Sequence, residues 1–517
     1  MQSTEHSGNG ASKMVHRNRE LLRITSLIYA TLASLCNGSI VVFSLYAPTF
    51  QARLHYTTFQ INGIAIAGSL ALYLPMSIMG YVCDRAGSAF LALLSSTLYG
   101  AGYLLAACTY SRLQGDYMSE MNQTWLYILM LLAFVFIGTG TCTLYIASVT
   151  TCAKNFAYSR YRGLSIAMPV TAFGLSGVLI SQAASRLFAI STGDGDREID
   201  VFSFFLFLSV LLFSIGLIGA LVLRAVDVDG QEEIGTEASG DSEQPSRRGY
   251  NTIRPEPVHD NSEESSLQDR RLAGLTAAVY AFLTDATVWP FALAFFLLVG
   301  PTEAFINNLG SILTSLSPHG IIDSTAPATH ISIFSLPSTF ARLFLGTLTD
   351  LFAPAQQTME PIPNQRFHIS RVTFIVIFAL LQSFALLFLA SGLVQNHTER
   401  FWIVSGLMGL GCGAFYTLSP LIVAIVWGVE NFGTNFGIIT MIPAFGSASW
   451  GLIYSALYQS NSRPTNPVNP GDEVFCYGKQ CYASTFWIEG CIMWVACALI
   501  IWAWKGKGGW QERGIVL

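Results

Sequence analysis

The stretch Gly80-Tyr-Val-Cys-Asp84-Arg85-Ala-Gly87 decides how the rest of this sequence is interpreted. It lies between two long apolar segments and places an acidic and a basic residue where a membrane helix would end and the chain reverse. A charged side chain is costly in the hydrocarbon core, so such a pair belongs at the membrane interface. The flanking glycines allow neighbouring helices to approach closely. The stretch therefore predicts a short loop between two membrane-spanning helices.

The composition of the chain indicates a membrane protein with many spans. Apolar residues make up 52% of the 517 residues and charged residues 11%, whereas a soluble domain carries about 25% charged residues. The net charge of −5 says little about partners, because most of the acidic excess lies in one central segment. We expect an all-α polytopic membrane protein whose surroundings are the lipid bilayer.

The apolar segments divide evenly between two halves of the chain. A spanning helix needs about 20 apolar residues, and the breaks between apolar runs predict twelve spans at 24–48, 61–82, 87–108, 125–148, 163–188, 201–223, 288–314, 327–349, 371–394, 401–427, 433–458 and 484–504. Six spans per half predict two related six-helix bundles. The expected domains are an N-terminal tail at 1–23, a bundle at 24–223, a linker at 224–287, a second bundle at 288–504 and a C-terminal tail at 505–517.

The predicted linker differs in composition from everything around it. Between Asp227 and Glu264 it is acidic and rich in Ser and Pro, with few large apolar side chains. Such a composition cannot bury a core, so we expect a disordered cytosolic segment. After it, apolar residues recur at helical spacing at Leu272, Leu275, Val279 and Phe282. That spacing predicts an amphipathic helix on the membrane, with a solvated helix lacking a partner as the alternative.

Repeated motifs indicate that the two halves are duplicates. Gly346-Thr-Leu-Thr-Asp350 repeats the Gly-x-x-x-Asp spacing of the first loop 266 positions later. In the fourth and tenth spans, three residues recur with an offset of 271, namely Gly138, Gly140 and Tyr145 against Gly409, Gly411 and Tyr416. Such small residues let helix backbones touch. Static packing and faces that slide during alternating access both remain open.

The distribution of Lys and Arg predicts the orientation of the chain in the membrane. With a cytosolic N-terminus, thirteen basic residues of the short segments fall on the cytosolic side and six on the other. This excess favours cytosolic termini. The sequons at Asn122 and Asn396 then lie on the non-cytosolic side, where glycosylation occurs. Cys476 and Cys481 share the last non-cytosolic loop, where a local disulfide and two free thiols are equally open.

Ionisable residues inside spans are candidates for function, because their desolvation must be offset by a partner or a wet cavity. Arg342 lies eight residues before Asp350, or about 12 Å into the membrane at 1.5 Å per residue. It is an anion-contacting or gating arginine, or else a cation that pairs with helix-end carbonyls or snorkels to the cytosolic face. Glu303 lies near the middle of the seventh span, with Asn307 one turn later on the same face. Glu303 is either a proton carrier or an ion-pair partner of Arg342.

Other polar residues are weaker candidates for contact with a solute. Asn37, Tyr145 and Tyr416 lie on spans that line the cavity between halves in duplicated transporters, and helix-to-helix hydrogen bonds are the alternative for each. Glu489 lies about five residues inside the last span, so we expect interfacial solvation. The sequence contains no phosphate-binding loop, metal-ligand spacing or nucleophilic triad. We therefore expect no enzymatic activity, no cofactor and no nucleic-acid partner.

Taken together, the twelve spans, the long central loop and the Gly80-to-Gly87 motif resemble the major facilitator superfamily. Ser88, Ala89 and Phe90 stand where basic residues often follow the loop glycine in that superfamily. Within it, the stretch Tyr158-Ser-Arg-Tyr-Arg-Gly-Leu-Ser165, followed by AMPVTAFGLSG, is similar to monocarboxylate-transporter-like proteins. The nearest resemblance is to fungal homologues assigned to the vacuolar membrane.

The resemblance implies a monomeric secondary-active transporter of a small organic solute, located in the vacuolar membrane and working by alternating access. Arg342 falls where the group carries a substrate-linked arginine, which favours an anion. Ser338 and the first-span stretch Asn37-Gly-Ser39 replace the acidic residue and the lysine that the group would use. Ordinary monocarboxylate–proton symport is therefore not expected, while other proton coupling stays open.

The resemblance also implies roles for the repeated loops. Gly80, Asp84, Arg85 and Gly87, with Gly346 and Asp350 as their counterpart, would form gating loops that stabilise closure on the cytosolic side. The alternative function is a nutrient sensor of the same fold that transports nothing and signals through the central loop.

Overall fold

The computed structural model describes residues 5–54, 56, 58–113, 120–159, 161–191, 197–225, 277–316, 326–352, 369–461, 463–464 and 474–517. Within this part of the chain, twelve helical stretches are long and apolar enough to cross a membrane. The predicted all-α fold with twelve spans is therefore confirmed. Most of the predicted linker, residues 226–276, lies outside the described residues, as do Leu272 and Leu275 of the predicted amphipathic helix.

The N-terminal bundle consists of α1 (Glu5–Cys36), η1 (Ser39–Val42), α2 (Phe43–Leu54), α3 (Thr58–Tyr73), α4 (Met76–Ala86), α5 (Ser88–Leu113), α6 (Glu120–Asn155), α7 (Arg162–Leu187) and α8 (Val201–Val222). The second span runs over both α3 and α4; these two helices are separated at Pro75, whose ring cannot continue a helix ladder. The antiparallel strands β1 (Ala189–Ser191) and β2 (Arg197–Ile199) connect α7 to α8.

The C-terminal bundle consists of α10 (Val288–Asn307), α11 (Leu309–Leu316), α12 (Ala326–Phe352), α13 (Arg371–Ala390), η2 (Thr398–Arg400), α14 (Phe401–Val426), α15 (Phe432–Thr440), α16 (Ile442–Asn461), β3 (Arg463–Pro464), β4 (Val474–Phe475), η3 (Lys479–Cys481) and α17 (Ala483–Lys505). The eleventh span contains both α15 and α16. A short helix at 277–284 precedes α10.

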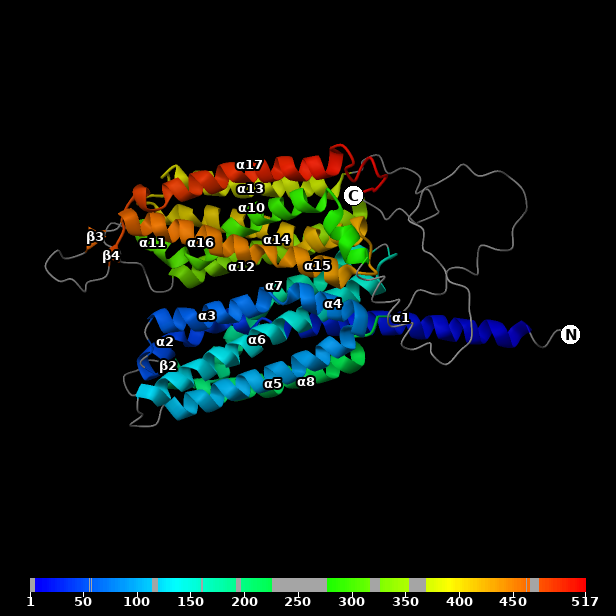
Figure 1. Ribbon diagram of the computed structural model, residues 1–517, viewed down its shortest axis with the longest axis horizontal. Coiled ribbons are helices and arrows are strands. Elements are labelled where there is room, and N and C mark those ends of the chain that lie inside the picture. The colour runs from blue at the N-terminus through cyan, green and yellow to red at the C-terminus, as the bar shows by residue number, and fades with distance from the viewer. Residues whose placement is uncertain are drawn as a thin grey trace.

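The two bundles lie alongside each other, with α7 and α12 among the helices between them (Figure 1). One end of the molecule, where α8 ends and α10 begins, also carries the C-terminal segment and the start of α1 (Figure 1). We call it the linker end. The opposite end, which carries β3, β4 and α11, is called the far end.

Matched glycines occupy equivalent helix crossings in the two bundles. A Cβ atom added to Gly138 would lie 2.3 Å from the carbonyl oxygen of Gly68. A Cβ added to Gly409 would lie 2.1 Å from that of Phe334. The two contact partners, 68 and 334, are themselves 266 positions apart. The duplication inferred from the sequence is thus repeated in the contacts, and these glycines permit the close crossings.

The C-terminal segment after α17 folds back onto the bundle instead of leaving it. Trp510 is fully buried, and its Nε1 donates a hydrogen bond of 2.9 Å to Thr287 Oγ1. Its ring centroid lies 5.7 Å from that of Phe291 and 6.0 Å from that of Trp427. The segment at 505–517 is therefore docked at the start of α10.

An ion pair fixes the same segment to the residue at which the chain enters α10. Both terminal nitrogens of Arg513 donate to the Asp285 carboxylate, at 2.6 and 2.7 Å. Burial opposes the ionisation of Asp285, but the hydrogen bonds from Arg513, Thr287 and Trp427 outweigh it. Together they hold the pKa of this carboxyl below its usual range.

Loops at the far end are held together by polar contacts and a disulfide. Cys476 and Cys481 are joined in the structure, with their Cα atoms 5.8 Å apart. The neighbouring Tyr477 hydroxyl donates to the Asn396 side-chain oxygen at 2.8 Å. Asn396 is exposed, while the side chain of Asn122 lies outside the described residues. Glycosylation at both sequons stays a prediction.

Candidate functional site

Three predicted residues meet at the centre of the molecule, each from a different helix of the C-terminal bundle. The Tyr416 hydroxyl (α14) donates a hydrogen bond of 2.6 Å to Glu303 Oε1 (α10). The guanidinium carbon of Arg342 (α12) lies 5.3 Å from the centroid of the Tyr416 ring, a cation–π contact. Tyr416 therefore lies between Glu303 and Arg342, and Glu303 is hydrogen-bonded to Tyr416. We call these three residues the central cluster.

Arg342 reaches across the interface between the two bundles. Its side chain is only 8% exposed, and its Nη1 donates a hydrogen bond of 2.7 Å to the Val170 carbonyl of α7. A Cβ at Gly174 would lie 2.4 Å from the same nitrogen, so the glycine makes room for the guanidinium. The Nε of Arg342 lacks a hydrogen-bond partner among the described residues. This arginine therefore lies inside the protein and does not snorkel to the membrane face, and one donor is available to another group.

Tyr145, the duplicate of Tyr416, approaches the central cluster from the N-terminal bundle. Its side chain is 6% exposed and its ring centroid lies 5.0 Å from that of Phe173. It also lies within electrostatic range of Arg342. Equivalent tyrosines from both halves thus approach the same arginine. The repeated Gly-x-Gly-x-x-x-x-Tyr pattern predicted that the two tyrosines are equivalent, but it did not predict their common neighbour.

Tyr73 is a member of the site that sequence reasoning missed. It ends α3 in the N-terminal bundle and interacts with both Tyr416 and Glu303 of the other bundle. The available signal was its position two residues before Pro75, where the second span breaks and a side chain can be turned toward the centre.

Asn307 and Asn37 do not join the central cluster. Asn307 is exposed at the end of α10, and its side-chain amide donates to Ser447 Oγ at 3.2 Å. Asn37 is fully buried within the N-terminal bundle, where it donates to the Thr141 carbonyl at 3.0 Å and accepts from the Tyr99 hydroxyl at 2.5 Å. The contacts of Asn37 match the helix-to-helix hydrogen bond that was the alternative for this residue.

Glu489 was expected at the membrane interface, and this expectation is wrong. The side chain is 1% exposed and lies inside the C-terminal bundle. The position of Glu489 near the start of α17 does not determine whether its side chain meets water, because neighbouring helices cover this face of α17.

At the linker end, Asp84 of α4 binds the start of α15 in the opposite bundle. Its carboxylate accepts hydrogen bonds from the backbone N–H groups of Gly433 (3.2 Å) and Thr434 (2.6 Å) and from the Thr434 hydroxyl (2.8 Å). Lys154 Nζ, at the end of α6, lies 2.7 Å from the same carboxylate. A negative charge at a helix N-terminus is stabilised by the unpaired N–H groups and the helix dipole.

Asp350 of α12, in the C-terminal bundle, makes the equivalent contact with the N-terminal bundle. Its two oxygens accept hydrogen bonds from the N–H groups of Gly163 (2.7 Å) and Leu164 (2.8 Å) at the start of α7. Gly163 and Gly433, the receiving glycines, are 270 positions apart in the sequence. Each bundle therefore supplies one aspartate and one helix whose first N–H groups donate to the aspartate of the other bundle. We call the two sites the Asp84 contact and the Asp350 contact.

Close glycine crossings accompany both contacts. A Cβ at Gly80 would lie 1.9 Å from the Gly433 carbonyl oxygen, and one at Gly346 would lie 2.5 Å from the Ala167 Cβ. No larger residue fits at Gly80 while the linker end is closed. Gly87 has a φ of +86° and ends α4. This glycine therefore permits the turn after α4 and is not part of the close helix crossing.

The loop motif suggested that Arg85 takes part in the Asp84 contact, but it does not. It is exposed, whereas the basic partner of Asp84 is Lys154, which comes from the fourth span. The charge partner of Asp84 therefore comes from the end of α6, about 70 positions later in the chain, and not from the loop itself.

Comparisons with known proteins agree on the family and the fold. A family model described as Nodulin-like matches residues 23–243. The "Probable transporter MCH1" of Gibberella zeae is 47% identical over 548 residues, covering 100% of this chain and 96% of the relative. The protein of the same name in Saccharomyces cerevisiae is 27% identical and covers 84% of each chain.

Solved structures of two transporters share the architecture. The proton:xylose symporter XylE has a TM-score of 0.62 at 12% identity, covering 95% of this chain and 98% of the other. The major facilitator transporter FucP in the outward conformation has a TM-score of 0.55 at 13% identity, covering 92% and 98%. These matches are named as transporters and not as enzymes. The chain belongs to the family of fungal probable transporters named MCH1 and has the fold of the major facilitator superfamily.

Proposed function

We propose that this protein is a secondary-active transporter that moves a small organic solute by alternating access. The observation that carries the proposal is the mirrored pair of aspartate contacts, which close the same end of the bundle interface from both sides. Hydrogen bonds of this kind can hold the end closed in one state and break when the two bundles separate in another. The names of the relatives support transport and give no support to the sensor alternative.

The contacts define what must break when the linker end opens. Among the described residues, opening of the linker end breaks the three hydrogen bonds at Asp84 and the two at Asp350, and it uncovers two glycine crossings. We propose that the linker end and both termini face the cytosol, in agreement with the distribution of basic residues. Location in the vacuolar membrane rests on the family resemblance.

The central cluster suggests an organic anion as the solute. Arg342 has an unused donor and already spans the interface, so an anionic group bound to it would contact both bundles. Glu303 would release or take up a proton as its bond to Tyr416 changes during the cycle. The family resemblance implies a lysine in the first span and an acidic residue four positions before Arg342, but the stretch Asn37-Gly-Ser39 contains no lysine and position 338 is a serine, so the proposal does not include ordinary monocarboxylate–proton symport.

The test begins with metabolite profiling of isolated vacuoles with and without the protein. Solutes that change are then offered to proteoliposomes that contain the purified full-length chain under an imposed pH gradient. We expect uptake of an organic anion that is lost in Arg342→Lys, because a lysine lacks the planar donor set. We also expect that Glu303→Gln abolishes the response to the pH gradient.

Exposed residues of the same types provide matched controls. Arg400→Lys and Glu399→Gln change residues at the far end that lie outside the central cluster, so uptake by these variants should equal that of the wild type. Absence of uptake for every solute would contradict the transporter proposal. A linker deletion that abolishes a cellular output while sparing solute binding would favour the sensor.

We also propose that the protein is glycosylated and monomeric. Asn122 and Asn396 carry N-linked glycans, which a mobility shift after peptide N-glycosidase treatment would reveal and which Asn→Gln variants would lack. The protein functions as a monomer, which light scattering of the purified chain tests directly.

A further inference from the structure

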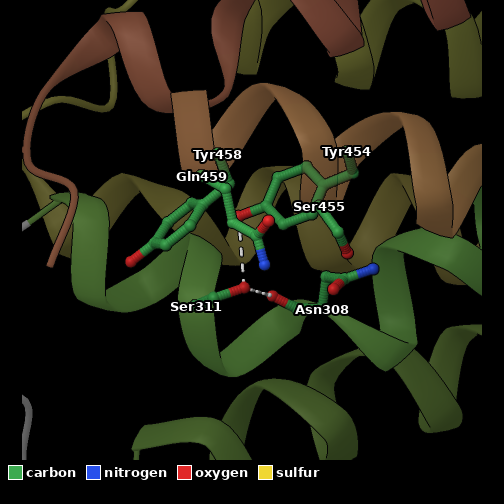
Figure 2. Close-up of a pocket in the computed structure, with 6 residues that line it drawn as sticks. All are labelled: Asn308, Ser311, Tyr454, Ser455, Tyr458 and Gln459. Atoms are coloured by element: carbon green, nitrogen blue, oxygen red, sulfur yellow. Dashed lines mark hydrogen bonds between the residues drawn. The ribbon is translucent and has the colours of Figure 1, made fainter. Parts of the chain in front are cut away.

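A polar cavity lies at the far end of the C-terminal bundle, between α10–α11 and α16 (Figure 2). Its volume is about 210 Å³, and its lining consists of hydroxyl and amide side chains from Asn308, Ser311, Tyr454, Ser455, Tyr458 and Gln459. Ser311 Oγ and the Tyr454 hydroxyl lie 3.2 Å apart across it. A cavity of this size with several polar partners holds water.

Behind this cavity, three buried polar atoms lack a hydrogen-bond partner among the described residues. They are Glu489 Oε2 and Thr485 Oγ1, one turn apart on α17, and Trp450 Nε1, one turn before Tyr454 on α16. Glu489 is 1% exposed and Trp450 5% exposed. Native proteins rarely leave such groups unsatisfied, so each one calls for an explanation such as water, an ion or a proton.

Ring contacts show how Glu489 faces the cavity wall. The Phe486 ring packs against Tyr454 of α16 at 6.0 Å and against Phe305 of α10 at 6.3 Å, measured between centroids. Glu489 is three residues later and therefore on the same face of α17. It also lies within electrostatic range of Tyr454. Tyr454 thus separates the buried carboxyl from the cavity, with its hydroxyl on the cavity side.

The surroundings of Glu489 provide no described positive charge. The facing helix α16 contributes Tyr454 and Tyr458 as its titratable groups. From α10 the one titratable side chain is Glu303, which is bonded to Tyr416. On α13, Ser383 covers the other face of α17 through a bond to the Gly490 carbonyl, and on η3 Lys479 is exposed and donates to the Ser391 carbonyl. An ionised carboxylate buried without a cation is strongly unfavourable.

We propose that Glu489 is a proton-binding site, distinct from Glu303, that exchanges its proton with the solution at the far end through the Tyr454–Ser311 cavity. A hydronium ion in the cavity water gives one proton to the carboxylate, which leaves water and the neutral acid, and the proton returns to water by the same route. Glu303 lies at the bundle interface, whereas Glu489 lies within one bundle. The inference goes beyond the proposed function, because proton binding at Glu489 does not require transport.

Infrared spectroscopy of the purified full-length protein in nanodiscs tests the site directly, without any solute. We expect a carbonyl stretching band of a protonated carboxyl at neutral pH, shifted by transfer to deuterated water. The band should be absent from Glu489→Gln and present in the matched variants Glu303→Gln and Glu399→Gln. An identical band in Glu489→Gln would overturn the proposal.

Thermal unfolding checks that the loss of the band is not caused by misfolding. Glutamine resembles the neutral acid in shape and charge, so the Tm of Glu489→Gln at neutral pH should equal that of the wild type. A Tm of Glu489→Gln clearly below that of the wild type at neutral pH would indicate that an ionised carboxylate stabilises the wild type, and it would contradict proton binding.

Exchange kinetics test the route through the cavity. Tyr454→Phe keeps the ring but removes the hydroxyl, and it should slow deuterium exchange of the Glu489 band about 10²-fold, the low end for a positioned proton-transfer group. Tyr477→Phe, which alters another far-end hydroxyl bonded to Asn396, is the control and should exchange at the wild-type rate. Equal rates in both variants would overturn the route. Loss of the band when sodium replaces choline at constant pH would assign the site to a metal cation instead.

Discussion

The Asp84 and Asp350 contacts use the same chemistry but differ in where the neighbouring positive charge resides. Lys154, the partner of Asp84, belongs to the same bundle as that aspartate. Asp350 lies within electrostatic range of Arg371 in its own bundle and of Arg162 in the opposite bundle. When the bundles separate, Lys154 travels with Asp84, whereas Arg162 moves away from Asp350. Closure at Asp84 therefore rests on hydrogen bonds, while closure at Asp350 also includes charge attraction across the interface.

The glycine crossings should give the largest difference between the two contacts. In Gly80→Ala the new Cβ would lie 1.9 Å from the Gly433 carbonyl oxygen, whereas in Gly346→Ala it would lie 2.5 Å from the Ala167 Cβ and 3.2 Å from the Gly163 carbonyl oxygen, so the approach to the backbone is closer at Gly80. Overpacking costs about 1–3 kcal/mol, and the backbone clash at Gly80 should exceed that. We expect loss of closure in Gly80→Ala and a partial shift in Gly346→Ala. Spin labels at the linker end would measure the change in distance between the bundles.

Gly406→Ala is the control for this experiment, since nothing lies within 4 Å of the added Cβ. Equal shifts in Gly80→Ala and Gly346→Ala would show that the two crossings are interchangeable.

Removal of each carboxylate charge should have the next largest effect. A hydrogen bond to a charged group contributes about 1.5–3 kcal/mol, so Asp84→Asn and Asp350→Asn should both favour opening at the linker end. Because the contacts close one interface, each variant should raise deuterium exchange at the starts of both α7 and α15, with the larger increase at its own contact. Mass spectrometry resolves the two segments. An increase confined to the mutated contact would mean that the contacts open independently.

Replacement of the basic neighbours tests the asymmetry itself and should have a smaller effect. Lys154→Met removes a charge that stays with Asp84 in both states, so the distance distribution between spin labels should change little. Arg162→Met removes attraction across the interface and should shift the distribution toward opening, by about 1 kcal/mol for a partly screened pair. A larger shift in Lys154→Met than in Arg162→Met would reverse the comparison.

Asp285 provides a third carboxylate that pairs within one bundle, and its variant should change bundle separation least. Its pKa in the folded protein lies below the unfolded value of about 3.9, so its contribution to tail docking is complete above that value and is lost as the pH falls through the folded pKa. Fluorescence of Trp510, measured as the difference from Trp510→Phe, should be constant between pH 7 and about pH 4. In Asp285→Asn it should indicate exposure at all pH values, while the distance between bundles stays unchanged.

The sequence predicted the acceptors of the closing hydrogen bonds better than it predicted their donors. The Gly-x-x-x-Asp spacing identified Asp84 and Asp350, because a carboxylate at the end of an apolar run is conspicuous. The donors at Gly163 and Gly433 are backbone N–H groups, which every residue but proline carries, so no side chain in the sequence identifies them. The offset of 270 between these glycines was nevertheless present in the sequence.

The central residues illustrate a different limit of sequence reasoning. Glu303, Arg342 and Tyr416 were each identified because polar groups are costly in a span. Which of them bond to each other depends on how α10, α12 and α14 are rotated, and spacing along single helices does not contain that information. The same limit explains the wrong expectation for Glu489, whose burial is determined by the facing helices α10 and α16.

The docked C-terminal segment has a practical consequence for handling the protein. Trp510 is fully buried and Leu517 is only 4% exposed, so anything fused directly after Leu517 emerges from a packed surface. A bulky fluorescent or affinity tag at that position would compete with the pairing of Arg513 and Asp285 and perturb the entrance of α10. A fusion at the start of the chain, or one behind a long flexible spacer, leaves the entrance of α10 intact.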